Sequence, residues 1–331
     1  MSTPLLELTD LSTHFHTPGG VVRAVDGVSL TLEEGRTLGL VGESGCGKSV
    51  LARTLMGLLP SYAVIGPGSE MRLAGRDLLT LTRRERRALC GRDMAMVFQD
   101  PMTTLNPVIR VGDQIAEGLT QHLGASRRAA RRRAIELLAE VGIPQPDRRV
   151  DEYPHQLSGG MRQRVAIAIA VACEPRLLIA DEPTTALDVT VQAGILDLLG
   201  RQQRERSMAM ILITHDLGVV AGRSDSVAVM YAGRLVEHAP TRALFRRTRM
   251  PYTQALLDSI PKLDAPAHQR LPSIGGRPPD LIHPPPGCRF RPRCAAASAS
   301  CERPPPLAAA EDDQAHRFAC WHPLGAAPAS R

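Results

Sequence analysis

The chain has 331 residues, a formal net charge of +6, 43% hydrophobic residues and 22% charged residues. This length is enough for one large or two smaller domains with a substantial core. The composition is that of an ordinary globular protein, which argues against a disordered or fibrous chain. The modest positive charge permits contact with nucleic acid or an anionic membrane surface but identifies neither.

The sequence predicts neither a membrane span nor a secretion signal. No run approaches the roughly 18 apolar residues that cross a bilayer, and the segment Met1–Asp10 lacks the charged-then-apolar plan of a signal peptide. We therefore expect a cytosolic protein. Seven cysteines in a reducing compartment argue against a disulfide framework.

The first predicted elements are β-strands. Residues 5–32 contain β-like segments at Val21–Val25 and Val28–Leu32, with a turn at Pro18–Gly20. This pattern predicts an antiparallel sheet. We expect this sheet to pack beside the nucleotide-binding core. The next element, Thr37–Val41, is an apolar run of strand length.

A glycine-rich loop follows that strand and precedes a predicted helix, Ser49–Met56. Its sequence, Gly-Glu-Ser-Gly-Cys-Gly-Lys-Ser, fits the pattern G-x-x-x-x-G-K-[ST] of a phosphate-binding loop in the required strand–loop–helix context. The glycines let several backbone N–H groups point inward, and the helix N-terminus adds partial positive charge. We expect Lys48 to reach the β- and γ-phosphates of a nucleotide and Ser49 to hold Mg²⁺. The predicted phosphate-binding residues are Gly42, Ser44, Gly45, Cys46, Gly47, Lys48 and Ser49.

The middle of the chain is predicted to be mostly helical. Apolar residues recur at helical spacing in Gln114–Leu123 and Ser126–Val141, which indicates a helical insertion. A cluster of arginines in the second helix is interpreted as a solvated face. Farther on, Ser158, Gly159 and Gly160 open an apolar helix, Val165–Cys173. Their backbone N–H groups either bind an anion or simply form a helix N-terminus with a glycine turn.

Strand character returns at Leu177–Ala180 and Met210–Ile213, with a helix at Val189–Arg206 between them. Buried strands that alternate with helices predict a largely parallel α/β sheet. The first of these strands ends in Asp181 and Glu182. A carboxylate in this position can hold Mg²⁺, the role we assign to Asp181, and the next one can act as a general base, the role we assign to Glu182. A closing hairpin is predicted at residues 227–237.

The tail has a different composition. Fourteen of the 27 prolines lie between Pro261 and Pro328, so long helices and central strands are not expected there. Four cysteines are clustered in this tail: Cys288, Cys294, Cys301 and Cys320. Four thiolates can bind zinc in a tetrahedron or hold a four-iron cluster, and the spacings match neither zinc ribbons nor ferredoxins.

The ordered set of motifs over residues 5–237 resembles ATP-binding cassette ATPases, whose signature is similar to Leu157–Arg164. The fold implied is a P-loop NTPase core with an antiparallel β subdomain, a helical insertion and a proline- and cysteine-rich extension. The resemblance implies that Gln99 contacts Mg²⁺ and senses a membrane partner, and that Asp188 belongs to a loop, Ala186–Asp188, at a dimer interface. It also implies that His215 contacts the γ-phosphate. Phe15 either stacks on adenine or packs in the core.

In this family the signature of one cassette completes the phosphate site of another. Ser158, Gly159 and Gly160 would then bind the ATP of a partner cassette, and the ATPase must dimerise to hydrolyse ATP. Closing and opening of the dimer would drive a membrane partner.

Residues 98–114, the segment Pro251–Pro261 and the cysteine-rich tail are similar to the cassettes of oligopeptide and dipeptide importers. This resemblance favours a [4Fe-4S] cluster at the four cysteines, with zinc or metal-free thiols as the alternatives. It implies ATP and Mg²⁺ as cofactors and a cassette domain at 1–240 with a helical subdomain near 100–172. The extension would occupy 241–331.

The implied protein is peripheral, on the cytoplasmic face of the membrane. Its expected partners are a second identical or related cassette, permease subunits and, indirectly, an extracytoplasmic solute-binding protein. No nucleic acid partner is expected. The alternatives are a soluble cassette ATPase that acts on nucleic acid or ribosomes, and an interaction subunit with an inactive site, which Lys48 and Glu182 argue against.

Overall fold

The structure, a computed structural model, describes residues 4–100, 104–185, 187–260 and 274–325. Within these ranges the chain divides into two compact units. Unit 1 is built from residues up to 5, from 33–36 and from 77–213, and unit 2 from 6–32, 37–76 and 214 onward. This division differs from the expected domain boundary at residue 240, which stays a prediction.

Unit 1 contains a parallel sheet covered by helices. Its strands follow the order β9 (Ala209–Thr214), β8 (Leu177–Asp181) and β7 (Met94–Val97). Every residue of these strands is buried, which explains why they read as continuous apolar runs in the sequence. The strands at 177–180 and 210–213 are thus confirmed. The helices of unit 1 are α2 (Arg83–Leu89), α4 (Val111–Leu123), α5 (Arg127–Glu140), α6 (Pro146–Arg149), α7 (Gly159–Val171) and α8 (Val189–Glu205), with a 3₁₀ turn η1 (Pro154–Gln156).

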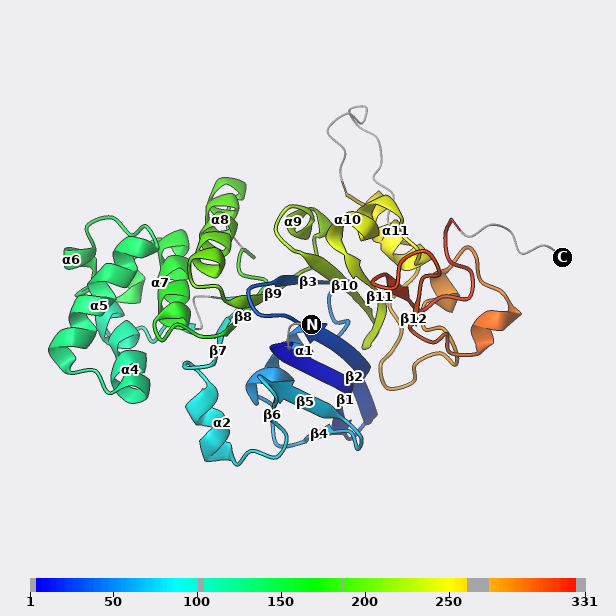
Figure 1. Ribbon diagram of the computed structural model, residues 1–331, viewed down its shortest axis with the longest axis horizontal. Coiled ribbons are helices and arrows are strands. Elements are labelled where there is room, and N and C mark those ends of the chain that lie inside the picture. Colours follow the sequence, from blue (N-terminus) through cyan, green and yellow to red (C-terminus); the bar gives the residue numbers. More distant parts are fainter. Residues whose placement is uncertain (1–3, 101–103, 186, 261–273, 326–331) are drawn as a thin grey trace. The chain divides into compact units, whose positions relative to one another are not determined.

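Helices α4, α5 and α7 contact one another and form a helical group (Figure 1). Helix α4 ends at Gly124, which adopts a left-handed conformation, and the side chain of Ser126 caps α5. One face of α5 buries Ala130, Ala134, Leu137 and Leu138. The arginine cluster lies largely on the exposed side, as the helical spacing predicted.

Unit 2 contains an antiparallel sheet in the order β2 (Gly20–Leu32), β1 (Leu6–Thr17), β5 (Glu70–Leu73) and β6 (Arg76–Asp77), with β4 (Ala63–Ile65) paired to β1. The predicted turn joins β1 to β2, because Thr17 pairs with Gly20 across it. The sequence indicated only the second of these long strands. Three register shifts interrupt the pairing of β1, so its apolar residues do not alternate regularly.

A second sheet of unit 2 contains β3 (Thr37–Val41), which is parallel to β10 (Ser226–Tyr231). Strand β11 (Arg234–Pro240) continues it as the predicted hairpin, followed by β13 (Arg317–Phe318) and β12 (Ala308–Ala309). The helices of unit 2 are α1 (Lys48–Met56), α9 (Leu217–Ala221), α10 (Thr241–Arg246) and α11 (Pro251–Asp258), with 3₁₀ turns η2 (Arg291–Arg293) and η3 (Ala299–Glu302).

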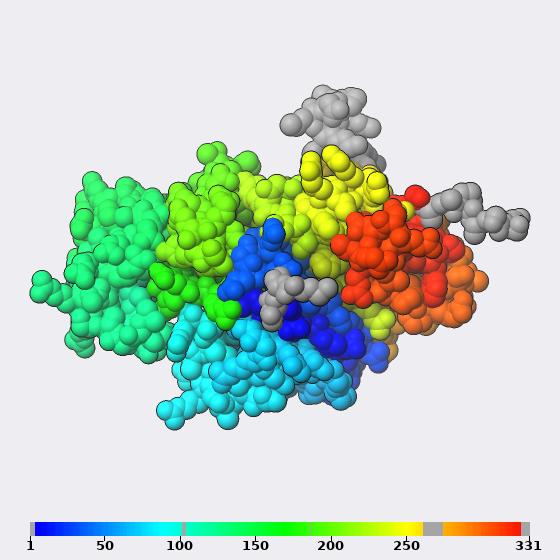
Figure 2. All heavy atoms as spheres, viewed as in Figure 1, coloured from blue at the N-terminus to red at the C-terminus, as the bar shows by residue number. Residues whose placement is uncertain are grey.

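Residues 274–325 of the C-terminal extension contain only 3₁₀ turns and two-residue strands, as their prolines predicted. This segment packs beside α10 and α11 (Figure 2, orange to red beside yellow). Strand β13 attaches it to β11, because Glu237 pairs with Phe318 and His238 with Arg317. The extension is therefore part of the same compact unit as the glycine-rich loop.

Candidate functional site

The glycine-rich loop of unit 2 runs from the end of β3 to the first residue of α1. Gly42, Gly45 and Gly47 all have positive φ, at 152°, 79° and 109°. A Cβ at Gly47 would lie 2.1 Å from the carbonyl oxygen of Ala24, which no side chain tolerates. Gly47 also provides no side-chain cap to α1. The loop thus leads into a helix N-terminus without a side-chain cap, an arrangement that is suited to an anion.

The side chain of Lys48 is folded into this loop and is only 4% exposed. Its Nζ donates to the carbonyl oxygens of Gly42 at 2.7 Å and Glu43 at 3.1 Å. Burial raises the pKa of the neighbouring Cys46 thiol. Cys46 is therefore a small buried side chain, and Lys48 supplies the positive charge of the loop.

In unit 1, the two predicted carboxylates, Asp181 and Glu182, lie at the end of β8. Asp181 is buried at the end of the strand, and Glu182 follows in a left-handed conformation with φ of 44°. The Oε2 atom of Glu182 accepts hydrogen bonds from Gln99 Nε2 at 3.0 Å and from Thr185 Oγ1 at 3.1 Å. The structure thus brings together two predicted residues that are 83 positions apart, and Thr185 is a contact that the sequence did not indicate.

The signature segment, also in unit 1, starts helix α7. The Oγ of Ser158 accepts a hydrogen bond from the N–H of Met161 at 3.3 Å. A Cβ at Gly160 would lie 2.8 Å from a methyl group of Val191 in the first turn of α8. The side chain of Asp188 caps that helix by accepting from the N–H of Val191 at 2.9 Å. The signature and the Asp188 loop therefore lie side by side. Ala186 of this loop and residues 101–103 lie outside the described residues.

Comparison with known proteins decides the family. A model described as "ABC transporter" matches residues 25–185, and one described as "Oligopeptide/dipeptide transporter, C-terminal region" matches 236–301. The chain is 49% identical to the dipeptide transport ATP-binding protein DppD of Bacillus subtilis, over 96% of this chain and 94% of the relative. It is 48% identical to the oligopeptide transport ATP-binding protein OppD of Salmonella typhimurium, over 97% and 94%. The chain belongs to the ABC transporter family.

The fold of an ABC transporter cassette is confirmed by solved structures. The dimeric structure of the ATP-binding cassette MJ0796 in a post-hydrolysis state, bound to ADP and Pi, has a TM-score of 0.64 and 26% identity and covers 72% of this chain and 99% of that one. Family and fold together confirm the predicted resemblance and the predicted class of activity, an ABC ATPase. Within the described residues, no helix combines the length and the apolar character that crossing a membrane requires.

Two more predicted site residues of this ABC transporter chain, Phe15 and His215, lie in unit 2. Phe15 on β1 is half-buried, and its ring centroid lies 5.8 Å from that of Tyr62, which is itself exposed. The pair forms a surface aromatic cluster, so Tyr62 joins Phe15 as a candidate for stacking on a base. His215 follows β9 and is exposed. Sequence analysis missed Tyr62 because no motif marks it.

The predicted [4Fe-4S] cluster and its zinc alternative are wrong. Among the described residues, which include all four cysteines, no group of three or more His, Cys, Asp or Glu side chains is placed to hold a metal ion. Burial raises the pKa of Cys288, Cys294 and Cys320, the last to about 11. Metal ligation needs thiolates, and these environments favour thiols. Spacing alone could not show where the sulfur atoms point.

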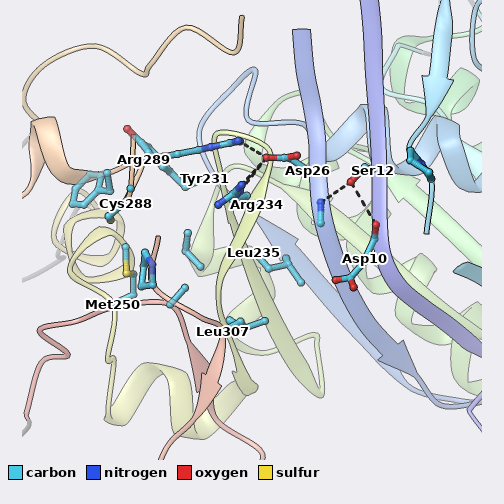
Figure 3. Close-up of a pocket in the computed structure, with 17 residues that line it drawn as sticks. Asp10, Ser12, Asp26, Tyr231, Arg234, Leu235, Met250, Cys288, Arg289 and Leu307 are labelled. Atoms are coloured by element: carbon cyan, nitrogen blue, oxygen red, sulfur yellow. Dashed lines mark hydrogen bonds and ion pairs between the residues drawn. The ribbon is translucent and has the colours of Figure 1, made fainter. Parts of the chain in front are cut away.

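Charged and aromatic side chains hold the extension instead. Arg289 is buried and donates to the carboxylate of Asp26 and to the carbonyl oxygen of Ala232, and Arg234 donates to the same carboxylate at 2.9 Å (Figure 3). His316 contacts buried Glu237 at 2.7 Å. A cavity of about 360 Å³ lies beside Asp26, Arg234 and Arg289. These ion pairs fix the extension to β2 and β11.

Proposed function

We propose that this chain is the ATP-hydrolysing subunit of a peptide importer. The observation that carries the proposal is the buried Lys48 ammonium, held by backbone carbonyls inside a glycine loop at a helix N-terminus. That arrangement is suited to the phosphates of a nucleotide. The relatives that cover nearly the whole chain are dipeptide and oligopeptide transport ATP-binding proteins, which supports peptides as the cargo of the complete transporter.

In this function the phosphates of ATP bind to the loop residues Gly42, Ser44, Gly45, Cys46, Gly47, Lys48 and Ser49. Lys48 exchanges its carbonyl partners for oxygens of the β- and γ-phosphates. The N–H groups of the loop and of the first turn of α1 donate to the same phosphates. Phe15 or Tyr62 stacks on the adenine.

Hydrolysis is proposed to use the polar residues of the later sequence motifs. Ser49, Gln99 and Asp181 are suited by their oxygen atoms to hold Mg²⁺, which neutralises phosphate charge when bound. Glu182 accepts a proton from the attacking water as general base, and the hydrogen bonds from Gln99 and Thr185 orient its carboxylate. His215 holds the γ-phosphate and the water in line.

The proposed active form is a cassette dimer in which Ser158, Gly159, Gly160 and Asp188 complete the site of the partner. A helix N-terminus attracts anions, so the position of Ser158, Gly159 and Gly160 at the start of α7 supports this role. The dimeric state of the MJ0796 cassette with ADP and Pi supports it as well. The partner cassette is either a second copy or a related chain.

The remaining partners follow from transport. We propose that the chain docks peripherally on the cytoplasmic face of the membrane against permease subunits, and that a solute-binding protein delivers peptide to them. Residues 1–240 would form the cassette, with a helical subdomain near 100–172, and residues 241–331 the extension. The match of residues 236–301 to a peptide-transporter C-terminal region supports this division.

Peptide uptake tests the proposal. The chain is purified with its permease and partner cassette, reconstituted in vesicles with ATP, Mg²⁺ and solute-binding protein, and assayed with labelled di- and oligopeptides. We expect ATP-dependent uptake that Lys48→Ala abolishes. ATP hydrolysis that no peptide stimulates, with no uptake of any peptide, would contradict the assignment to peptide import. Co-purification with ribosomes or nucleic acid instead of a permease would favour the soluble alternative.

A further inference from the structure

The extension contains an arginine that reaches into the phosphate loop. Arg293, the last residue of η2, has a side chain that is only 3% exposed. Its Nη1 donates to Glu43 Oε2 at 2.6 Å, and its Nη2 donates to Glu43 Oε1 at 2.9 Å. The two groups thus form a bidentate pair between positions that are 250 residues apart. Such a planar pair is short, directional and strong when it is shielded from water.

The rest of the guanidinium is held equally firmly. Nε donates to the carbonyl oxygen of Gly275 at 2.8 Å, and Nη2 also donates to that of Ile274 at 3.1 Å. Nη1 further donates to the Tyr231 hydroxyl at 3.3 Å. These contacts fix the direction of Arg293, so the position of the guanidinium determines where the carboxylate of Glu43 lies.

Glu43 is the second residue of the phosphate loop, and it touches the loop lysine directly. Its carbonyl oxygen accepts a hydrogen bond from Lys48 Nζ, and its N–H donates to the Tyr252 hydroxyl at 2.9 Å. The side chain of Glu43 is thus held by the extension, its N–H by α11, and its carbonyl oxygen holds Lys48. A displacement of Glu43 would move one of the two carbonyl oxygens that orient the Lys48 ammonium.

A second contact path runs from the same segment to the loop. Arg289 donates to the carbonyl oxygen of Ala232, and the N–H of the next residue, Gly233, donates to the carbonyl oxygen of Cys46 at 2.8 Å. Between the two arginines, the ring of Phe290 packs on Tyr231 and Tyr252 with centroid distances of 5.3 Å and 5.2 Å. The segment from Arg289 to Arg293 therefore supports the phosphate loop at two points, and Phe290 anchors this segment in a buried aromatic cluster.

We propose that Arg293 is a positioning residue for nucleotide binding. Through Glu43 it holds the phosphate loop and Lys48 in the geometry that accepts the phosphates of MgATP, and the C-terminal extension is thereby an energetic part of the ATP site. This inference rests on the proposed binding of ATP by the phosphate loop. By linkage, nucleotide at the loop in turn stabilises the segment around Arg293.

The test is the dissociation constant for MgATP of the purified full chain, measured by titration under non-hydrolysing conditions. We expect Arg293→Gln to raise this constant about tenfold. Arg293→Lys keeps the positive charge but cannot form the bidentate pair, so a smaller rise of about threefold in the dissociation constant is expected. The matched control is Arg291→Gln, in the same 3₁₀ turn, because Arg291 pairs with the exposed Glu302 instead of the loop. Its affinity should match that of the parent.

A double-mutant comparison separates positioning from general destabilisation. Glu43→Gln and Arg293→Gln remove the same interaction. The double variant should therefore weaken MgATP binding about tenfold and not a hundredfold. Loss of folded protein would lower the number of binding sites per chain, whereas a positioning role changes the dissociation constant. MgATP should also slow amide exchange at residues 288–294 in the parent and not in Arg293→Gln.

The outcomes are distinct. If Lys48→Ala abolishes MgATP binding while folded Arg293→Gln binds within twofold of the parent, the inference is wrong and the phosphate site stands. If Lys48→Ala binds as tightly as the parent, the proposed phosphate site is wrong and the inference fails with it. If Arg293→Gln does not fold, Arg293→Lys and Glu43→Gln decide the question by the same twofold limit.

Discussion

At the residue scale, the phosphate loop depends on glycines that no other residue can replace. Gly42 has a φ of 152°, and a Cβ there would lie 2.2 Å from the carbonyl oxygen of Met230. The backbone of the loop must therefore lie directly on β10. The motif predicted the glycine, but the reason for it here is a contact with a strand that is almost 190 positions away in the sequence.

Gly42→Ala should reduce the free energy of unfolding by about 3 kcal/mol, because a strained φ and a collision with backbone act together. The matched control is Gly68→Ala. Gly68 also has a positive φ, of 81°, but a Cβ there meets nothing within 4 Å, so a loss of about 1 kcal/mol is expected. Urea denaturation of both variants gives the comparison. Equal losses would mean that the close approach to Met230 has no energetic weight.

At the element scale, two helices begin in the same way, but only one of these helix starts is proposed to bind nucleotide. Ser158 caps α7 and Ser126 caps α5, each through an N–H···Oγ hydrogen bond of 3.3 Å. The sequence predicted both helices, because their apolar spacing and caps are local signals. The sequence could not predict which of the two helix starts lies against the Asp188 loop. The contact of Gly160 with Val191 identifies α7 as that helix, and this contact comes from packing.

Ser158→Ala and Ser126→Ala should each cost about 1 kcal/mol of stability, the usual value for a lost N-cap. Only Ser158→Ala should also lower the ATPase rate of the assembled transporter, by an expected factor of at least ten, since only that helix start is proposed to bind the partner's ATP. Equal ATPase rates for the two variants would show that Ser158 is merely a cap.

The attachment of β13 to β11 should depend on pH. Burial, with help from the charges of Arg317 and His316, lowers the pKa of His238 to about 4. The unfolded chain, with an ordinary histidine pKa near 6.5, therefore binds this proton more readily than the folded chain. The stabilisation is complete above pH 6.5 and is lost as pH falls towards 4, with a total of about 3 kcal/mol.

His238→Gln should flatten the dependence of unfolding free energy on pH between 6.5 and 4, relative to the parent. His283→Gln serves as the control, because the His283 side chain is largely exposed. Denaturant titrations at several pH values measure both. An identical pH dependence for the parent and His238→Gln would contradict a neutral, half-buried imidazole in the folded state.

At the scale of the whole molecule, the order of motifs predicted the family, the fold and the class of activity. The four cysteines led to a wrong prediction of a metal cluster, since their spacing does not determine where the thiols point. The sequence also did not indicate that the extension is built into the unit that carries the phosphate loop. The contacts responsible, such as Arg293 with Glu43, join residues 250 positions apart and have no local signature.

Glu182 is proposed to act as the base for ATP hydrolysis in an importer subunit. The most direct measurement is the MgATP hydrolysis rate of the transporter assembled with Glu182→Gln. Glu205→Gln is the control, because Glu205 ends α8 and is exposed. We predict a rate at least a hundredfold lower for Glu182→Gln, with unchanged ATP affinity, and a parental rate for Glu205→Gln. Hydrolysis by Glu182→Gln at the parental rate would show that Glu182 is not the base.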